Sequence, residues 1–441
     1  MKKWIRYLFI FIFVFCIYEF FGFSNTYGDP LNNYVFSHAI VQGEIPYLDF
    51  NILTTPLYTF VMSIGLFFFD NYLMFVIEQS ILVTIMFYFL FEIYGKKSYF
   101  LLFCICLFRF LGINATYNFM ALFMLVILLY LEKKCPDKDY LIGFVIGCAV
   151  LSKHTVGAFF ILPSIIYYFR DIKKLLRRAI GFLIPWFIFL IYLVYNQALY
   201  PFIDLCFLGL LDFSSDNGRP FSLYFFLSIF LLVIQIVIII KNKKDIRNCY
   251  LIMGFSFMIP IFDFPHFSIY IICFILQILD FIPIKRGYFY GLMGFLSFLF
   301  SILLFIAYCN LLNPVWATDI LGFQYTLCAS EEYQKSVKYF DFFDQYDNKL
   351  ILSPNSTQYK ASRGENITYF DLLHDGNFGY HGEKKMINKI KKMHDVYIIV
   401  NLDFYHDDNP NNQFNKAIVK HVIDSYEKVD SWGDFDVYYK N

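Results

Sequence analysis

Long apolar runs alternate with short polar or charged breaks over the first three quarters of the chain. A membrane-spanning helix needs roughly 20 mostly apolar residues, and twelve runs are candidates for such helices, several of them short. The runs are Tyr7–Phe23, Leu53–Phe69, Tyr72–Tyr94, Tyr99–Leu111, Phe119–Leu131, Tyr140–Leu151, Val156–Phe169, Ile180–Tyr195, Phe221–Ile240, Tyr250–Phe262, Phe267–Ile282 and Tyr288–Leu311. The pattern therefore predicts an α-helical polytopic membrane protein.

The apolar pattern ends near Asn313, where the chain becomes charged and mixed. Short apolar and aromatic runs predict strands, and two longer patterned stretches predict helices. The strands are Lys349–Leu352, Val396–Asn401 and Asp434–Tyr439, and the helices are Glu383–Met393 and Asn412–Tyr426. We expect a membrane domain over residues 1–312, with its first outer loop at 24–55, and an extracytoplasmic α/β domain over 313–441.

The distribution of basic residues predicts the topology. Cytoplasmic loops carry an excess of Lys and Arg, and five basic clusters stand between apolar runs: Lys96–Lys97, Lys133–Lys138, Arg170–Arg178, Lys241–Arg247 and Lys285–Arg286. The first run lacks a small-residue cleavage site and follows Lys2, Lys3 and Arg6, so we interpret it as an uncleaved span with a cytoplasmic N-terminus.

If every apolar run crosses the membrane, counting from a cytoplasmic N-terminus puts the basic clusters outside, which contradicts their expected cytoplasmic location. The conflict disappears if one run, Leu53–Phe69, does not cross and instead lies at the outer leaflet, packed against protein. This leaves about eleven spans and an outer C-terminus. A normal crossing with one misassigned basic cluster is the alternative.

This topology gathers the unexplained polar segments on the outer face. They are the loop Ser24–Thr55, the turns Gly112–Asn118, Ser152–Thr155 and Asp263–His266, and the loop Asn196–Pro220. Long polar loops beside a rigid scaffold often carry function.

Composition agrees with a membrane protein: 59% of residues are hydrophobic and 16% are charged, against about a half and about a quarter in soluble domains. The net charge of +0 gives no support for a nucleic-acid partner. The ten Cys lie mostly in apolar runs without a metal-like spacing, so we interpret them as small apolar residues.

Asp29 lies between Gly28 and Pro30, before a predicted helix at Leu31–Gln42. It is either a helix cap or turn residue, or a general base or metal ligand at the membrane surface. Glu44, in the turn that ends this helix, is a structural or a substrate-binding residue. Asn118, at the end of an outer turn, is a further substrate-binding candidate.

Two polar breaks between apolar runs add candidates. Lys153 and His154 put two cations at one outer turn, which suits a phosphate group, and Arg109 is a third cation near an outer end. Alternatively, Lys153 binds no phosphate, and its long side chain extends to the membrane–water interface so that the ammonium is hydrated. Asp263 and His266 form the second break, which is either a Pro-bent corner or part of a substrate site.

These motifs, in this order, resemble the GT-C superfamily of membrane glycosyltransferases, in particular bacterial relatives of protein O-mannosyltransferases and lipid A aminoarabinose transferases. An acidic residue, Asp29, follows the first span, and a helix then closes with Gly43-Glu44-x-Pro46-Tyr47-x-Asp49-Phe50 before Pro56-Leu57. Lys153-His154-Thr155-x-Gly157 resembles a Lys-Gln-Thr-x-Gly turn, and Asp263-x-x-His266 resembles a late polar turn. The resemblance covers about residues 1–310.

The resemblance implies an outer-facing cavity, a polyprenyl-phosphate sugar donor, an inverting transfer and a catalytic role for Asp29. Thr54 and Thr55 replace the Lys or His that often precedes the Pro-Leu pair, and the turn Gly112–Asn118 lacks the acidic residue that many relatives have there. Hard cations favour carboxylate-rich sites, so no cofactor is assigned and a divalent metal is left open.

We therefore expect a bacterial inner-membrane glycosyltransferase that moves a hexose or pentose from a polyprenyl-phosphate donor to a glycan, lipid or protein acceptor outside the cytoplasm. Asp29 is the expected catalytic base. Lys153, His154 and Arg109 are expected to bind the donor phosphate, and Asp263, His266, Glu44 and Asn118 are expected to bind substrate. A transporter or flippase of a lipid-linked glycan and a non-catalytic assembly protein are the alternatives; transporters often show internal repeats, which are not seen here.

Overall fold

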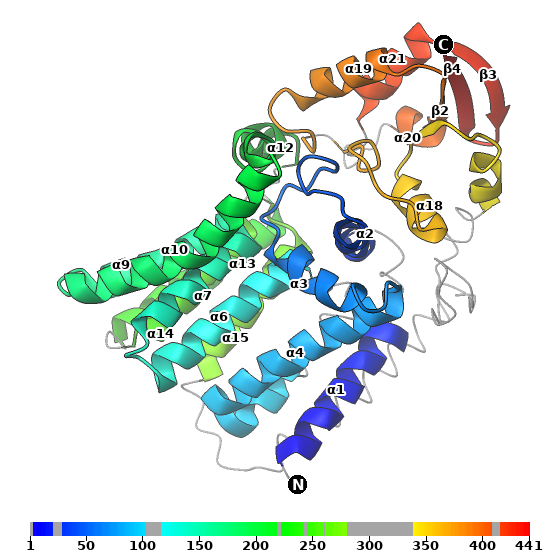
Figure 1. Cartoon of the computed structure of the whole chain (residues 1–441). Helices are drawn as coiled ribbons and strands as arrows, with labels where there is room; N and C mark the ends of the chain where they lie inside the picture. The colour runs from blue at the N-terminus through cyan, green and yellow to red at the C-terminus, as the bar shows by residue number, and fades with distance from the viewer. Residues whose placement is uncertain are drawn as a thin grey trace. The chain divides into compact units, whose positions relative to one another are not determined.

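The structure is a computed structural model that describes residues 3–20, 29–102, 116–217, 222–241, 245–259, 261–279, 338–374, 376–407 and 415–441 (Figure 1). The chain divides into two compact units. The first, here the helical unit, comprises Met1–Asn25, Thr54–Tyr192 and Arg219–Pro314. The second, here the mixed unit, comprises Thr26–Leu53, Leu193–Gly218 and Val315–Asn441. The predicted boundary near residue 312 lies outside the described residues.

Most elements of the helical unit are apolar α-helices. They are α1 (Lys3–Phe20), α3 (Leu57–Leu66), α4 (Tyr72–Tyr94), α6 (Tyr117–Lys134), α7 (Asp139–Ser152), α8 (His154–Gly157), α9 (Ile161–Tyr168), α10 (Ile172–Tyr195), α13 (Leu223–Lys241), α14 (Ile246–Met253) and α15 (Phe264–Leu279). Short 3₁₀ turns join some of them: η2 (Gly95–Lys97), η3 (Ala158–Phe160) and η5 (Gly254–Met258).

Three helices in the described ranges are long and apolar enough to cross a membrane: Tyr72–Leu102, Ile172–Tyr195 and Leu223–Lys241. Shorter apolar helices accompany them, among them α7 and α15. The prediction of a mostly helical chain with membrane-type helices is confirmed. The figure of about eleven crossings stays a prediction, because the run Tyr288–Leu311 and most of Tyr99–Leu111 lie outside the described residues.

Helix α3 has 10 residues, which at 1.5 Å per residue gives a length of about 15 Å. The hydrocarbon core of a bilayer is about 30 Å thick. The helix α3 is therefore about half as long as the hydrocarbon core is thick, and the prediction that Leu53–Phe69 does not cross stays a prediction.

Hydrogen bonds bring three of the five predicted cytoplasmic clusters together at one end of the helical unit. Lys133 Nζ donates to the carbonyl of Ile93 near the end of α4, at 2.6 Å, and Lys97 Nζ donates to Leu279 O at the end of α15, at 2.5 Å. Lys174 Nζ donates to Pro136 O at 3.1 Å. Cations beside helix C-termini satisfy the last carbonyls and oppose the helix dipole, which explains their positions at this end.

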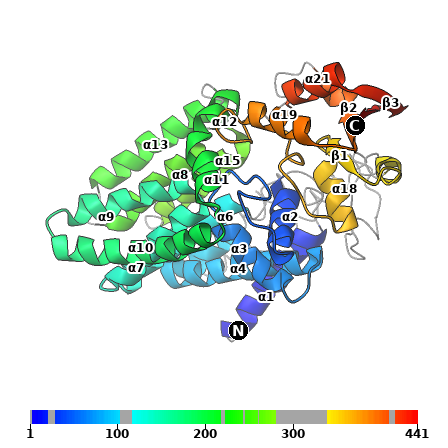
Figure 2. The ribbon, with the colours of Figure 1, turned by 45° about the horizontal axis from the view of Figure 1, so that its top comes forward.

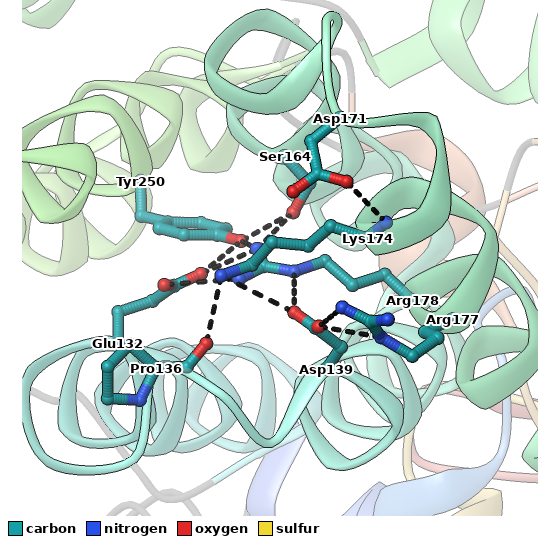
Figure 3. A network of polar contacts seen from close by, with 9 residues as sticks. All are labelled: Glu132, Pro136, Asp139, Ser164, Asp171, Lys174, Arg177, Arg178 and Tyr250. Atoms are coloured by element: carbon teal, nitrogen blue, oxygen red, sulfur yellow. Dashed lines mark hydrogen bonds and ion pairs between the residues drawn. The ribbon is translucent and has the colours of Figure 1, made fainter.

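A buried network around Arg178 ties five helices together at the same end (Figure 3). Arg178 Nη1 lies 2.7 Å from Glu132 Oε1, and Arg178 Nε lies 3.2 Å from Asp139 Oδ1. Ser164 of α9 and Tyr250 of α14 complete the network: Arg178 Nη1 donates to Ser164 Oγ at 2.9 Å, and the two hydroxyls lie 2.8 Å apart. The side chains of Arg178, Glu132 and Asp139 are only 3%, 1% and 2% exposed. Buried charges are tolerated when they are paired and hydrogen-bonded in this way.

Glycines allow α7 and α10 to approach closely enough for this network. A Cβ atom added at Gly143 would lie 1.9 Å from the carbonyl oxygen of Arg178, and one at Gly181 would lie 2.0 Å from that of Tyr140. Gly147, four residues after Gly143, faces Phe182 and Pro185 of α10 in the same way. Such small-xxx-small spacing is typical of closely packed membrane helices.

The mixed unit contains a four-stranded sheet of order β1-β2-β4-β3. The strands are β1 (Lys349–Leu352), β2 (Val396–Asn401), β3 (Glu427–Trp432) and β4 (Phe435–Lys440), with β1 parallel to β2 and the other neighbours antiparallel. The helices are α2 (Asp29–Val41), α11 (Leu199–Ile203), the π-helix η4 (Asp204–Leu208), α12 (Leu210–Asn217), α18 (Ser356–Arg363), α19 (Gly382–Lys392), α20 (Leu402–His406) and α21 (Lys416–Ser425).

Both faces of the sheet are covered. Ile398 and Val400 of β2 pack with Met386 and Ile390 of α19, and α21 lies beside α19 (Figures 1 and 2). Ile399 of β2 points the opposite way, into a cluster of aromatic side chains that includes Phe340, Phe343, Tyr359 and Phe435. The alternation follows from the two-residue repeat of a strand and yields two small cores.

The predicted strands β1 and β2 are confirmed with their bounds, and β4 begins one residue later than predicted. The predicted helix Glu383–Met393 corresponds to α19, and α21 begins later than predicted, at Lys416. Strand β3 was not predicted, because all six of its residues are exposed and no apolar repeat marks it. The helices α11, η4 and α12 stand where the sequence predicted an outer loop.

We predict that Arg178→Met destabilises the helical unit by about 3–5 kcal/mol, because Glu132 and Asp139 would stay buried without their shared cation. Arg177→Met is the matched control: Arg177 contacts the same Asp139 at 2.8 Å but is 43% exposed, so its removal should cost about 0–1 kcal/mol. Thermal unfolding of the purified protein compares the two; equal losses would contradict the role of Arg178.

Candidate functional site

A buried cation stands at a break between two apolar helices. Lys153 follows the last residue of α7 and precedes α8, and its Nζ donates to Asn118 Oδ1 at 2.7 Å. Both residues are 6% exposed. The ammonium also lies 5.7 Å from the ring centroid of Tyr117. The structure thus brings together two residues that the sequence proposed separately.

The local chain explains the break. Lys153 has extended backbone angles, φ −153° and ψ 103°, which interrupt the helix. Gly157 then lets α8 fold against α7, since a Cβ atom at this position would lie 2.2 Å from Val150 N. Thr55 closes the same region, with its Oγ1 donating to Val150 O at 2.7 Å. The break therefore places Lys153 in a packed, polar setting.

Two further polar residues follow Lys153. His154 is buried, with 8% of its surface exposed. The hydroxyl of Thr155 is buried as well and has no hydrogen-bond partner in the part of the chain that the structure describes. A buried hydroxyl normally has a partner, so Thr155 is suited to contact a ligand at this turn.

Asp263 and His266 form a second polar turn, at the start of α15. Asp263 Oδ1 accepts a hydrogen bond from the backbone N–H of His266 at 3.1 Å, as a helix cap does, and lies 2.6 Å from His266 Nδ1. A carboxylate at Nδ1 holds the ring so that Nε2 is left to contact another group. The turn can therefore act as an oriented hydrogen-bonding or proton-accepting group.

Both turns lie at the end of the helical unit opposite to the Arg178 network. Asn118 lies in the first turn of α6 and Lys153 follows α7, whereas Glu132 and Asp139 lie at the other ends of these helices. Asp263 precedes α15, whose other end accepts the hydrogen bond from Lys97. Helix α8 also contacts η5, which leads into the Asp263 turn. Basic residues and the Arg178 network thus lie at one end of the helical unit, and the candidate site residues lie at the other end.

Two further candidates, Asp29 and Glu44, belong to the mixed unit. Asp29 is exposed and is the first residue of α2, with its carbonyl accepting from Asn33 Nδ2 at 2.6 Å. Glu44 Oε1 accepts from Asn366 Nδ2 at 2.9 Å. Burial and the neighbouring Asp49 raise the pKa of the Glu44 carboxyl above its usual value. Glu44 thus has a partner within its own unit.

Arg109 lies outside the described residues. Within the described ranges, no three or more His, Cys, Asp or Glu side chains lie close enough together to hold a metal ion. The sequence did not predict the Arg178 network, because the basic cluster Arg170–Arg178 was interpreted only as a cytoplasmic loop. Two acidic residues at the ends of neighbouring apolar runs, Glu132 and Asp139, were the signal that could have indicated buried ion pairs.

We predict that Asn118→Leu lowers the free energy of unfolding by about 1–3 kcal/mol, since the buried ammonium of Lys153 loses an acceptor. Asn118→Asp keeps an acceptor of similar size and should cost clearly less. Thermal unfolding of both variants measures the difference, and an Asn118→Asp variant as unstable as Asn118→Leu would refute the pairing.

Comparisons of the chain with protein-family models, curated proteins and solved structures found no match. The resemblance seen in the motifs around Asp29, Lys153 and Asp263 therefore stays a prediction.

Proposed function

We propose that the protein is a membrane glycosyltransferase of the GT-C type, which moves a sugar from a polyprenyl-phosphate carrier to an acceptor outside the cytoplasm. The supporting observation is the buried cation Lys153, hydrogen-bonded to Asn118 at 2.7 Å at a break between apolar helices. Ionisable groups among membrane helices are costly and tend to be functional. The phosphate of a lipid-linked sugar is an anion held near the membrane surface, where a cation such as Lys153 could bind it.

The chemistry assigns one task to each cluster. The acceptor hydroxyl attacks the anomeric carbon while the bond from that carbon to the phosphate oxygen breaks, which inverts the configuration. Negative charge develops on the departing polyprenyl phosphate, and Lys153, with His154, stabilises it. Asp29 takes the proton from the acceptor hydroxyl.

The polar turn of Asp263 and His266 binds the sugar or the acceptor. The carboxylate of Asp263 fixes the imidazole through Nδ1, so that Nε2 meets a hydroxyl in a defined direction. Asn118 orients Lys153 and contacts the donor. The protein belongs, on this proposal, in a bacterial inner membrane with its N-terminus in the cytoplasm and residues 313–441 outside.

We predict that Asp29→Asn lowers kcat for transfer from polyprenyl-phosphate sugars by about 10²–10⁴-fold, the usual contribution of a general base. Asp70→Asn, which changes another exposed carboxylate, is the control and should retain wild-type activity. Transfer is measured with the purified protein in lipid nanodiscs. Unchanged activity of Asp29→Asn would remove Asp29 from the mechanism.

We predict that Lys153→Met weakens donor binding by at least about tenfold and lowers kcat, since a charge-assisted contact to phosphate contributes roughly 1.5–3 kcal/mol. Lys153→Arg keeps the positive charge and should recover part of the loss. The KM for the donor and kcat are measured for both. If wild-type protein moved the lipid-linked sugar across vesicles with no transfer, a flippase would replace the proposed enzyme.

A further inference from the structure

The segment between α18 and α19 contacts a loop that precedes it by more than three hundred residues. Asn366 Nδ2 donates to Glu44 Oε1 at 2.9 Å, and Asn51 Nδ2 donates to Asn377 O at 2.9 Å. The hydroxyl of Tyr369 donates to the carbonyl of Tyr47. The loop Gly43–Asn51 is therefore held at three places by the C-terminal part of the mixed unit.

The end of this segment and the first turn of α19 contact the helices that follow α10 in the chain. Lys385 Nζ lies 2.6 Å from Asp204 Oδ2 of the π-helix η4, and the N–H of His381 donates to Asp212 Oδ2 at 2.9 Å. Gly379 has φ +77°, and a Cβ atom added there would lie 2.5 Å from Asp204 Oδ2. Only a glycine-containing backbone fits this close contact.

The held loop contains a strained residue. Tyr47 is fully buried and has φ +72°, in the left-handed region that a bulky residue rarely adopts. Such a conformation costs on the order of 1–3 kcal/mol and persists when the surroundings determine it. Here the surroundings are the Tyr369 hydroxyl and the ring of Phe202, whose centroid lies 5.1 Å from that of Tyr47.

The loop also continues α2, the helix that begins at Asp29. Helix α2 contacts α18, so the C-terminal part of the unit touches both the helix and the loop that ends it. Asp49 closes the loop internally, with Oδ2 accepting from Ile45 N at 2.7 Å. Residues far along the chain thus contact both the loop and α2, the helix that begins at Asp29.

We propose that Asn366, Tyr369 and Lys385 are positioning residues for the transfer reaction, and that the Asp204–Lys385 ion pair fixes the segment that holds the loop Gly43–Asn51 and α2. This inference rests on the proposed function for its catalytic consequence. The C-terminal residues 338–441 are then an obligatory part of the acceptor side of the site rather than an independent appended domain.

A charge exchange tests this proposal in the full-length protein in nanodiscs. Asp204→Lys and Lys385→Asp each place like charges together, and the double variant restores an ion pair. We expect each single variant to increase hydrogen exchange of Gly43–Asn51, and the acceptor KM, by about tenfold, with donor KM unchanged. The double variant should return both values to within about threefold of wild type.

Lys428 and Asp436 provide a matched control pair on β3 and β4. Their charged atoms lie 2.7 Å apart with side chains 49% and 10% exposed, against 42% and 11% for Lys385 and Asp204. Lys428→Asp and Asp436→Lys should leave the exchange of Gly43–Asn51 and the acceptor KM unchanged, because this pair is not part of the segment that holds the loop.

Wild-type exchange and acceptor KM in both single variants would overturn the proposal, and so would equal effects in the control pair. Failure of the double variant to recover loop protection would overturn the role of the ion pair. Absence of transfer by wild-type protein would instead refute the proposed function, while recovered exchange protection in the double variant would still support the structural part.

Discussion

The burial of Arg178 with Glu132 and Asp139 is the constraint on which the helical unit depends. Charges removed from water are tolerated only when they neutralise one another and their hydrogen bonds are satisfied. Here that requirement brings the ends of α6, α7, α9, α10 and α14 to one place (Figure 3). The close contact of α7 and α10 at Gly143 makes this arrangement possible.

Two buried cations of the helical unit, Arg178 and Lys153, differ in the groups that they contact. Arg178 is bound by two carboxylates and a hydroxyl, so its charge is used within the fold. Lys153 donates a hydrogen bond to the amide oxygen of Asn118. A planar guanidinium suits the first role because it donates in several fixed directions, whereas an ammonium suits contact with a phosphate.

The pattern of apolar runs was sufficient to predict the helical class, most helix positions and the strands β1 and β2, because these elements carry strong local periodicity. The pairing of Lys153 with Asn118 could not be predicted, since it joins residues 35 positions apart. The same holds for the contacts of Tyr47 and Asp204 with the C-terminal segment, which depend on tertiary packing. Residues 196–220 were expected to form a loop; within the part described, they contain short helices that local propensity does not reveal.

The exposed strand β3 has a consequence for the solubility of the mixed unit. A strand at the edge of a sheet offers unpaired backbone groups to other chains. Strand β3 carries Glu427, Lys428 and Asp430, and its register with β4 shifts between Lys428 and Asp430. Charges and a bulge discourage a second strand from adding to this edge. The β3 edge of the sheet is thereby protected from becoming a template for aggregation.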